Sequence, residues 1–350
     1  MSSTSSLYSY SSARVKAMES MLVDPPTMQH IIDAGDVSGI LAILFQTDFK
    51  EDISRYGGME IKKNMIDFAL SRNLANHVNK LEAIVPTTQR KLIRAIIGKW
   101  DFYNVRLAIE AKDKKEDFDK IEPNIVDGPV YKQATIREAM REGSVEGVMS
   151  RLMINSPYSA ILKDASAVYS RTKDISETIT SLDIGYYGTL SGVIFELTNA
   201  HYQSALIIKK EIDMKNILTL IRAKRLGIKF QSIEKYLIGS GNITRKSLEQ
   251  LFGSYSGIED MIQHIDAFDL KESLDVYKRT KNLISFEIGM RNHIINYAIK
   301  SLKPTILSFG TILAYIYLKE MEIYTIRISV NSKLYGLTSE DISRLMIWKK

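Results

Sequence analysis

A glycine-rich stretch that ends in Lys246-Ser247 is the feature of this sequence that comes nearest to a known chemical motif. It reads Gly239-Ser-Gly-Asn-Ile-Thr-Arg-Lys-Ser247, and a phosphate-binding loop uses such glycines to bring backbone N–H groups against the phosphates of a nucleotide. That loop requires a glycine directly before its lysine and a strand ahead of it. Arg245 holds the glycine position and no strand is predicted before it, so the sequence predicts no nucleotide site.

The remaining reactive side chains are scattered along the chain. No two histidines lie four residues apart, and none has a carboxylate at the spacing of a metal site. Cysteine is absent, which excludes disulfides, thiolate zinc sites and a cysteine nucleophile. The serine hydrolase pattern Gly-x-Ser-x-Gly does not occur. We therefore predict no catalytic residues, no cofactor and no metal; the histidines are His30, His77, His201, His264 and His293.

Composition places the chain among folded proteins with a mild positive charge. Of its 350 residues 45% are hydrophobic, and Lys plus Arg exceeds Asp plus Glu by 47 − 41 = 6. A dedicated nucleic-acid binder concentrates its basic residues more strongly, whereas here the two signs are interspersed. The longest apolar run, Thr305–Leu318, is shorter than the roughly 20 residues that span a bilayer. We predict a buried helix for this run and a mobile tail for residues 1–7.

Three twelve-residue stretches share one design, with an acid first and a lysine last. They are Asp101–Lys112, Asp213–Lys224 and Glu322–Lys333. Eleven steps of about 100° bring the lysine back to the face of the acid, roughly 16 Å along a helix. An acid early and a lysine late suit the helix dipole, and the positions one, four and eight residues after the acid are mainly apolar. The pattern predicts one buried helix that occurs three times.

Two further patterns keep step with these helices. A second marker begins at Val37, Val145 and Ile258, and its distances to the acids are 101 − 37 = 64, 213 − 145 = 68 and 322 − 258 = 64. Ten or eleven residues before each marker, a hydroxyl residue followed by an apolar one is predicted to cap and open a short helix. These hydroxyl residues are Thr27, Thr135 and Ser247.

The spacing predicts an all-α protein of three similar helical domains, residues 1–127, 128–241 and 242–350. Strand patterns are scarce, and glycine clusters such as Gly185-Tyr-Tyr-Gly188 are predicted to separate helices.

Basic residues recur in the three predicted helices and are our candidates for contact with a partner. Three related domains could gather them around one axis as a ring of positive charge. The alternative, which the sequence favours, is that they pair with carbonyls at helix ends or with neighbouring acids. The residues are Lys112, Arg222, Lys224, Arg327 and Lys333.

Five segments, at both ends and in the middle of the chain, carry a resemblance to a known family: Tyr8–Glu19, Asn216–Lys224, Lys319–Arg327, Tyr335–Leu337 and Ile342–Arg344. They resemble the C subunit of archaeal and bacterial A/V-type ATPases, which is related to the d subunit of eukaryotic V-type ATPases. The family often has an asparagine where this chain has Thr325, which puts one polar contact in doubt.

The resemblance implies a funnel of three helical domains with pseudo-threefold symmetry. It implies a single copy, cytoplasmic and peripheral to the membrane, between the central shaft subunits of D and F type and the proteolipid ring. Such a rotor subunit transmits torque for proton or sodium transport and performs no chemistry. A helical scaffold that binds nucleic acid through its basic surplus is the rival hypothesis, and an enzyme with a site between repeats is a third.

Overall fold

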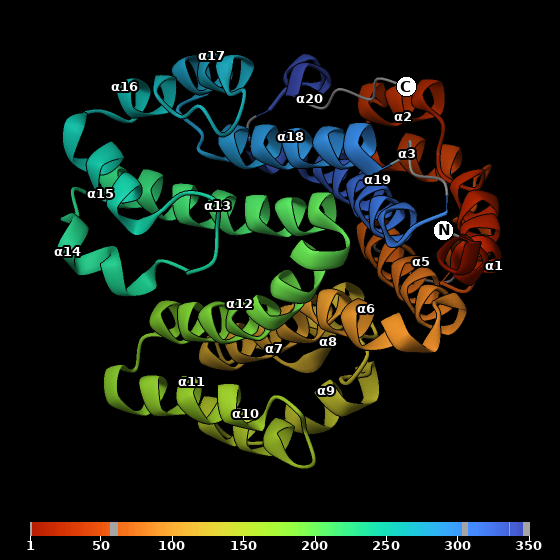
Figure 1. Cartoon of the computed structure of the whole chain (residues 1–350), viewed down its shortest axis with the longest axis horizontal. Helices are drawn as coiled ribbons and strands as arrows, with labels where there is room; N and C mark the ends of the chain where they lie inside the picture. The colour runs from red at the N-terminus through yellow and green to blue at the C-terminus, as the bar shows by residue number, and fades with distance from the viewer. Residues whose placement is uncertain (1, 57–61, 303–306, 336, 346–350) are drawn as a thin grey trace. The chain divides into compact units, whose positions relative to one another are not determined.

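The computed structural model of the chain describes residues 2–56, 62–302, 307–335 and 337–345. All regular structure in these ranges is helical (Figure 1), which confirms the predicted all-α class. The chain forms two compact units, and we call Met1–Asp48 with Ile194–Lys350 unit 1 and Phe49–Val193 unit 2. The division into three sequence domains and the mobility of residues 1–7 stay predictions, although helix α1 begins at Ser2.

Unit 1 contains both ends of the chain. Its N-terminal helices are α1 (Ser2–Glu19), α2 (Pro25–Asp33) and α3 (Val37–Leu44). Its C-terminal part comprises α13 (Tyr202–Arg225), α14 (Phe230–Ile233), η3 (Glu234–Tyr236), α15 (Arg245–Ser254), α16 (Ile258–Gln263), α17 (Lys271–Thr280), α18 (Ile284–Leu302), α19 (Phe309–Tyr335) and α20 (Ser339–Leu345).

Unit 2 consists of one long helix, α5, and several shorter ones. It comprises α4 (Lys50–Ser54), α5 (Lys62–Ile84), η1 (Thr87–Gln89), α6 (Arg90–Ile97), α7 (Lys99–Asp113), α8 (Phe118–Ile121), η2 (Glu122–Asn124), α9 (Gln133–Ala139), α10 (Val145–Met153) and α11 (Ser159–Thr172). Helix α12 (Ile175–Ala200) continues the chain into unit 1.

The three predicted helices exist as α7, α13 and α19, and each is buried where the pattern requires. Val105, Ile217 and Ile326 are fully buried core residues at the same position of the three helices. Helix α7 packs against α10, α13 against α18, and α19 against α18 and α1. The predicted apolar helix at 305–318 falls within α19 from Phe309 on, and residues 303–306 lie outside the described residues.

The short helices start with caps that differ in part from those predicted. Asp36 caps α3 as a helix break at that point requires, accepting the N–H of Gly39 at 2.8 Å. The residues at the N-cap positions of α2, α9 and α15 are Asp24, Lys132 and Thr244, however, so the prediction that a hydroxyl residue caps and opens each of these helices is wrong for Thr27, Thr135 and Ser247. All three hydroxyl residues lie in the first turn, where backbone N–H groups are the donors that a cap must satisfy.

Helix α12 also corrects the sequence prediction, because Gly185 and Gly188 lie inside it rather than between helices. A Cβ atom at position 185 would lie 2.3 Å from Cγ2 of Ile161 in α11. The glycine therefore permits a close approach of two helices, a role that local sequence does not distinguish from a turn.

Candidate functional site

The acid that opens the repeated helix in α7 is buried and holds the turn that follows in the chain. Asp101 has no exposed surface, and it accepts the backbone N–H of Tyr131 at 2.7 Å and of Val130 at 3.2 Å. Tyr158 donates its hydroxyl to the same carboxylate at 3.0 Å. A Cβ atom at Gly128 would lie 2.1 Å from Oδ1 of Asp101, so only glycine fits this turn. We call this contact join 1.

The same arrangement recurs in α13 as join 2. Asp213 is buried and accepts the backbone N–H of Ile243 at 2.9 Å and of Asn242 at 3.2 Å. The side-chain amide of Asn242 adds a bond at 2.9 Å. Gly241 repeats the glycine requirement, since its Cβ atom would lie 2.3 Å from Oδ1 of Asp213.

The third acid, Glu322, contacts the N-terminal part of the chain. Glu322 of α19 is fully buried and accepts the backbone N–H of Val23 at 2.6 Å. Val23 lies four residues before Thr27. The N–H donors of joins 1 and 2, Tyr131 and Ile243, likewise lie four residues before Thr135 and Ser247. In this contact, join 3, the acid is a glutamate, which reaches one methylene further, and no glycine stands in the turn.

The three joins differ in the cation near the acid. The residue three positions before the acid is Gly98 in join 1, Lys210 in join 2 and Lys319 in join 3. Lys319 and Glu322 form a buried ion pair at 2.5 Å, whereas Nζ of Lys210 bonds the carbonyl of Ala267.

Burial raises the pKa of the two aspartates to different extents. The pKa of Asp101 rises to about 6 because burial disfavours its charge more than the bonds from Tyr131, Tyr158 and Val130 favour it. The pKa of Asp213 is raised for the same reason, and the nearby charge of Lys210 works against the rise. Join 1 is therefore a carboxyl that can take up a proton near neutral pH.

An asparagine three residues after the acid clamps a second backbone segment in two of the joins. Asn104 donates to the carbonyl of Val126 at 2.6 Å and accepts its N–H at 3.1 Å. Asn216 does the same with Ile238, at 2.9 and 2.8 Å. Thr325 occupies this position in α19 and donates instead to the carbonyl of Met321 in its own helix. The contact that the sequence put in doubt is therefore replaced by a bond within the helix.

The lysines that end the repeated stretches make contacts inside the protein. Lys112 donates to the carbonyl of Met140 at 2.8 Å, and Lys224 donates to that of Phe252 at 2.6 Å. These carbonyls lie at the C-terminal ends of α9 and α15, where a cation is favoured by the helix dipole. Lys224 also lies 4.2 Å from the ring centroid of Phe252, and burial lowers its pKa. The side chain of Lys333 lies outside the described residues.

The two arginines of the predicted set lie on α13 and α19. Arg222 is exposed and lies 3.9 Å from Glu287 of α18, while Arg327 is partly buried. Among the contacts of the described residues, none joins two of the five predicted basic residues. Their role in binding a partner stays a prediction.

Sequence reasoning missed a cluster of charges between α13, α18 and α19. A small, partly open pocket lies there, lined in part by Glu211, Arg291 and Glu320. Arg291 pairs with Glu287 at 3.2 Å, and its guanidinium lies 4.8 Å from the ring centroid of Tyr324. The spacing of Glu287 and Arg291, one helical turn apart, was the available signal.

The opposite charges of Glu287 and Arg291 keep each other ionised. Burial disfavours the charge of Arg291, but Glu287 and the other carboxylates around it raise its pKa on balance. Burial likewise works against the charge of Glu287, but Arg291, Arg222 and Lys215 lower its pKa overall. The cluster is thus a set of partly buried opposite charges beside a pocket that apolar side chains such as Met214 and Ile294 also line.

The described residues hold no group of three or more His, Cys, Asp or Glu side chains that could bind a metal ion. No helix in the same ranges is long and apolar enough to cross a membrane.

Comparison with known proteins gives a consistent result over nearly the whole chain. Residues 11–345 match the model of the family described as ATP synthase (C/AC39) subunit. The A-type ATP synthase C subunit of Thermoplasma volcanium is 26% identical, covering 95% of this chain and 96% of its own length. That of Archaeoglobus fulgidus is 25% identical, covering 97% and 96%, and that of Methanocaldococcus jannaschii is 24% identical, covering 97% and 86%.

Proposed function

Because the chain belongs to the ATP synthase (C/AC39) subunit family, we propose that it is the central-stalk subunit that couples the rotating shaft of an A-type ATP synthase to the proteolipid ring. In this role it is present as one copy on the cytoplasmic side, peripheral to the membrane. It binds shaft subunits of D and F type and transmits torque for proton or sodium transport. It is an accessory, non-catalytic subunit and takes no small-molecule substrate.

The recurrence of the join is the observation that supports this role best. An adaptor that carries torque must resist shear between its helices, and closely packed interiors of low compressibility supply part of that resistance. In joins 1 and 2 a carboxylate, an asparagine and a lysine attach one long helix to three points of the following segment, at Tyr131 and Ile243 among others. Directional hydrogen bonds to buried backbone groups oppose sliding, because each displaced group would be left unsatisfied.

The charged cluster around Glu287 is the surface that we propose for a partner. Since Lys112 and Lys224 are engaged by carbonyls, Arg222 is the predicted basic residue whose exposed guanidinium is best able to contact another subunit. Contacts of this kind set the rate and specificity of association more than its strength.

Capture experiments with purified components test the proposal. The immobilised chain should retain co-expressed shaft subunits, and in a separate experiment the detergent-solubilised ring. The charge reversal Arg222→Glu should weaken the affinity for one of the two partners by about tenfold, equivalent to roughly 1.4 kcal/mol. The control variant Arg141→Glu, at an exposed residue of unit 2, should leave both affinities unchanged. Retention of neither partner would overturn the proposal. Retention on DNA that falls steeply with salt would favour the nucleic-acid scaffold instead.

A further inference from the structure

The first 48 residues pack in a unit whose remaining sequence begins only at residue 194. We call residues 1–48 the N-terminal arm; they belong to unit 1, but the chain continues directly into unit 2 at Phe49. Helices α1 and α2 pack against α19, and α2 also packs against α20. The arm is therefore held in unit 1 by noncovalent contacts alone.

Three hydrogen bonds connect α2 and the turn before it to the rest of unit 1. Val23 donates its N–H to Glu322 in join 3 at 2.6 Å. Gln29 donates to the hydroxyl of Ser343 at 2.9 Å. Ser339 donates its hydroxyl to the carbonyl of Ile32, also at 2.9 Å.

Join 3 differs from the other two in the length of chain that it closes. In joins 1 and 2 the acid and the bound N–H are 29 or 30 residues apart, so they cannot separate unless the short stretch between them unfolds. In join 3 they are 299 residues apart. The two sides of join 3 can therefore part while the helices on each side stay intact.

The chemistry of join 3 also favours opening. Among the described hydrogen bonds its acid accepts a single backbone N–H, and Thr325 supplies no clamp of the kind that asparagine gives elsewhere. The buried pair of Lys319 and Glu322 has lost its hydration, and a desolvated pair contributes little net stability. Departure of the arm returns both charges toward water.

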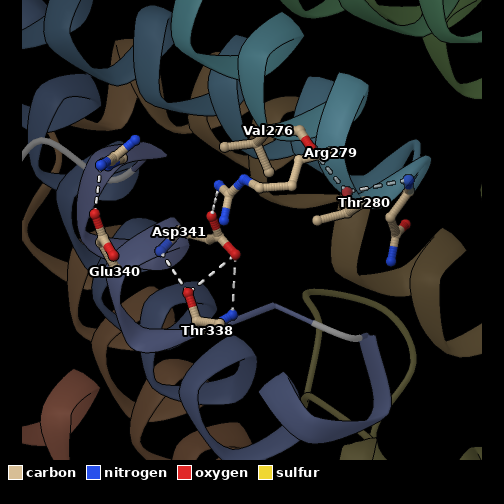
Figure 2. A network of polar contacts seen from close by, with 8 residues as sticks. Val276, Arg279, Thr280, Thr338, Glu340 and Asp341 are labelled. Atoms are coloured by element: carbon tan, nitrogen blue, oxygen red, sulfur yellow. Dashed lines mark hydrogen bonds and ion pairs between the residues drawn. The ribbon is translucent and has the colours of Figure 1, made fainter.

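Helix α20, on which α2 of the arm packs, also makes polar contacts with α17 (Figure 2). Asp341 of α20 is buried and accepts the N–H and the hydroxyl of Thr338 at 3.1 and 3.0 Å. Arg279 at the end of α17 donates to the same carboxylate. Helix α20 is therefore attached to α17 as well as packed against α2 of the arm.

We propose that join 3 is a clasp: the N-terminal arm detaches from unit 1 and returns as one cooperative unit while the rest of the chain stays folded. The arm remains connected through the peptide bond between Asp48 and Phe49. Its buried apolar residues, such as Met28 and Ile31, make the open state rare. Opening is nevertheless a smaller event than global unfolding, since it breaks one set of contacts within one unit. This inference does not depend on the proposed function.

Hydrogen exchange on the intact chain tests the clasp, with three equivalent amides as internal references. The N–H groups of Val23, Tyr131 and Ile243 are all bonded to a buried acid. We expect Val23 and the other protected amides of the arm to exchange together, with protection factors at least tenfold lower than those of Tyr131 and Ile243. Equal protection at the three amides would overturn the proposal.

A cross-link across the clasp separates opening of the arm from local fraying. The chain has no cysteine, so Gln29→Cys with Ser343→Cys gives one defined pair at a contact of 2.9 Å. Joined by a short bismaleimide, this variant should raise the protection of Val23 to that of Ile243. The same double variant without the linker is the matched control. If the linked and unlinked proteins exchange the arm amides at the same rate, those amides exchange by local motion and the clasp does not exist.

Discussion

Asparagine in place of Asp101 should change how the stability of the protein depends on pH. Burial raises the pKa of this carboxyl from 3.8 to about 6 in the folded protein. The folded state therefore binds the proton more tightly than the unfolded state. Protonation of Asp101 therefore stabilises the folded state. This stabilisation is complete below about pH 4 and is lost as pH rises through 6, where the carboxyl of the folded protein gives up its proton.

The magnitude follows from the two pKa values. A shift of one pKa unit corresponds to about 1.4 kcal/mol, so the full effect is about 3 kcal/mol. About 2 kcal/mol of it falls between pH 4.5 and pH 7.5. The neighbouring phenols do not titrate in this window, since burial raises the pKa of Tyr131 to about 12 and also raises that of Tyr158.

Urea unfolding of the wild type and of Asp101→Asn at several pH values measures the effect. Trp100 lies next to Asp101 in α7, and Trp348→Phe in both proteins makes its fluorescence the sole tryptophan signal. The free energy of unfolding of the wild type, relative to the variant, should fall by about 2 kcal/mol from pH 4.5 to 7.5.

A second carboxyl provides a control of opposite sign. Bonds from Thr338 and Arg279 outweigh burial and lower the pKa of Asp341, so its contribution to stability is lost as pH falls. This contribution is complete above about pH 4, so Asp341→Asn should show the reverse slope below that pH and almost none between pH 4.5 and 7.5. A flat difference for Asp101→Asn, or one that rises with pH, would refute the account of join 1 as a carboxyl with a raised pKa.

Two further substitutions test the geometry of the joins. Gly128→Ala should lower the free energy of unfolding by about 1–3 kcal/mol, because its Cβ atom would lie 2.1 Å from a carboxylate oxygen of Asp101. The control is Gly143→Ala, whose Cβ atom would have no atom within 4 Å and which should change the free energy of unfolding by less than about 1 kcal/mol. Equal effects of the two substitutions in urea unfolding would contradict the close approach at Gly128. Lys319→Met should lower the free energy of unfolding by about 3–5 kcal/mol, because it leaves the buried Glu322 without its ion-pair partner. The double variant Lys319→Met with Glu322→Gln should recover most of this loss. If the losses of the two single variants add up in the double variant, the two residues are not coupled.

The repeated helix was predictable because its signal is local. Acid, apolar positions and lysine lie within twelve residues, and α7, α13 and α19 follow from helical periodicity. The contacts of the lysines were also predictable in part. Lys112 and Lys224 bond carbonyls at helix ends, which is the alternative that the dipole argument favoured over a ring of charge.

The joins were not predictable in the same way. The partners of Asp101 and Asp213 are backbone N–H groups some 30 residues away, and every residue except proline carries such a group, so no residue type marks them. One signal was available: Gly128 and Gly241 follow their acids by 27 and 28 residues. Contact of Glu322 with Val23 had no such signal, because it connects opposite ends of the sequence.

The closure of α19 on Val23 sets an order of events during synthesis of the chain on the ribosome. The arm emerges first, yet the glutamate that receives it is made 299 residues later. At about 5–20 residues per second this interval is roughly 15–60 s. Throughout it, apolar residues that end fully buried, among them Met28 and Ile31, have no α19 to cover them. Residues 1–48 are thus made well before the helix that encloses them, and a nascent-chain chaperone would find a long-lived exposed segment there.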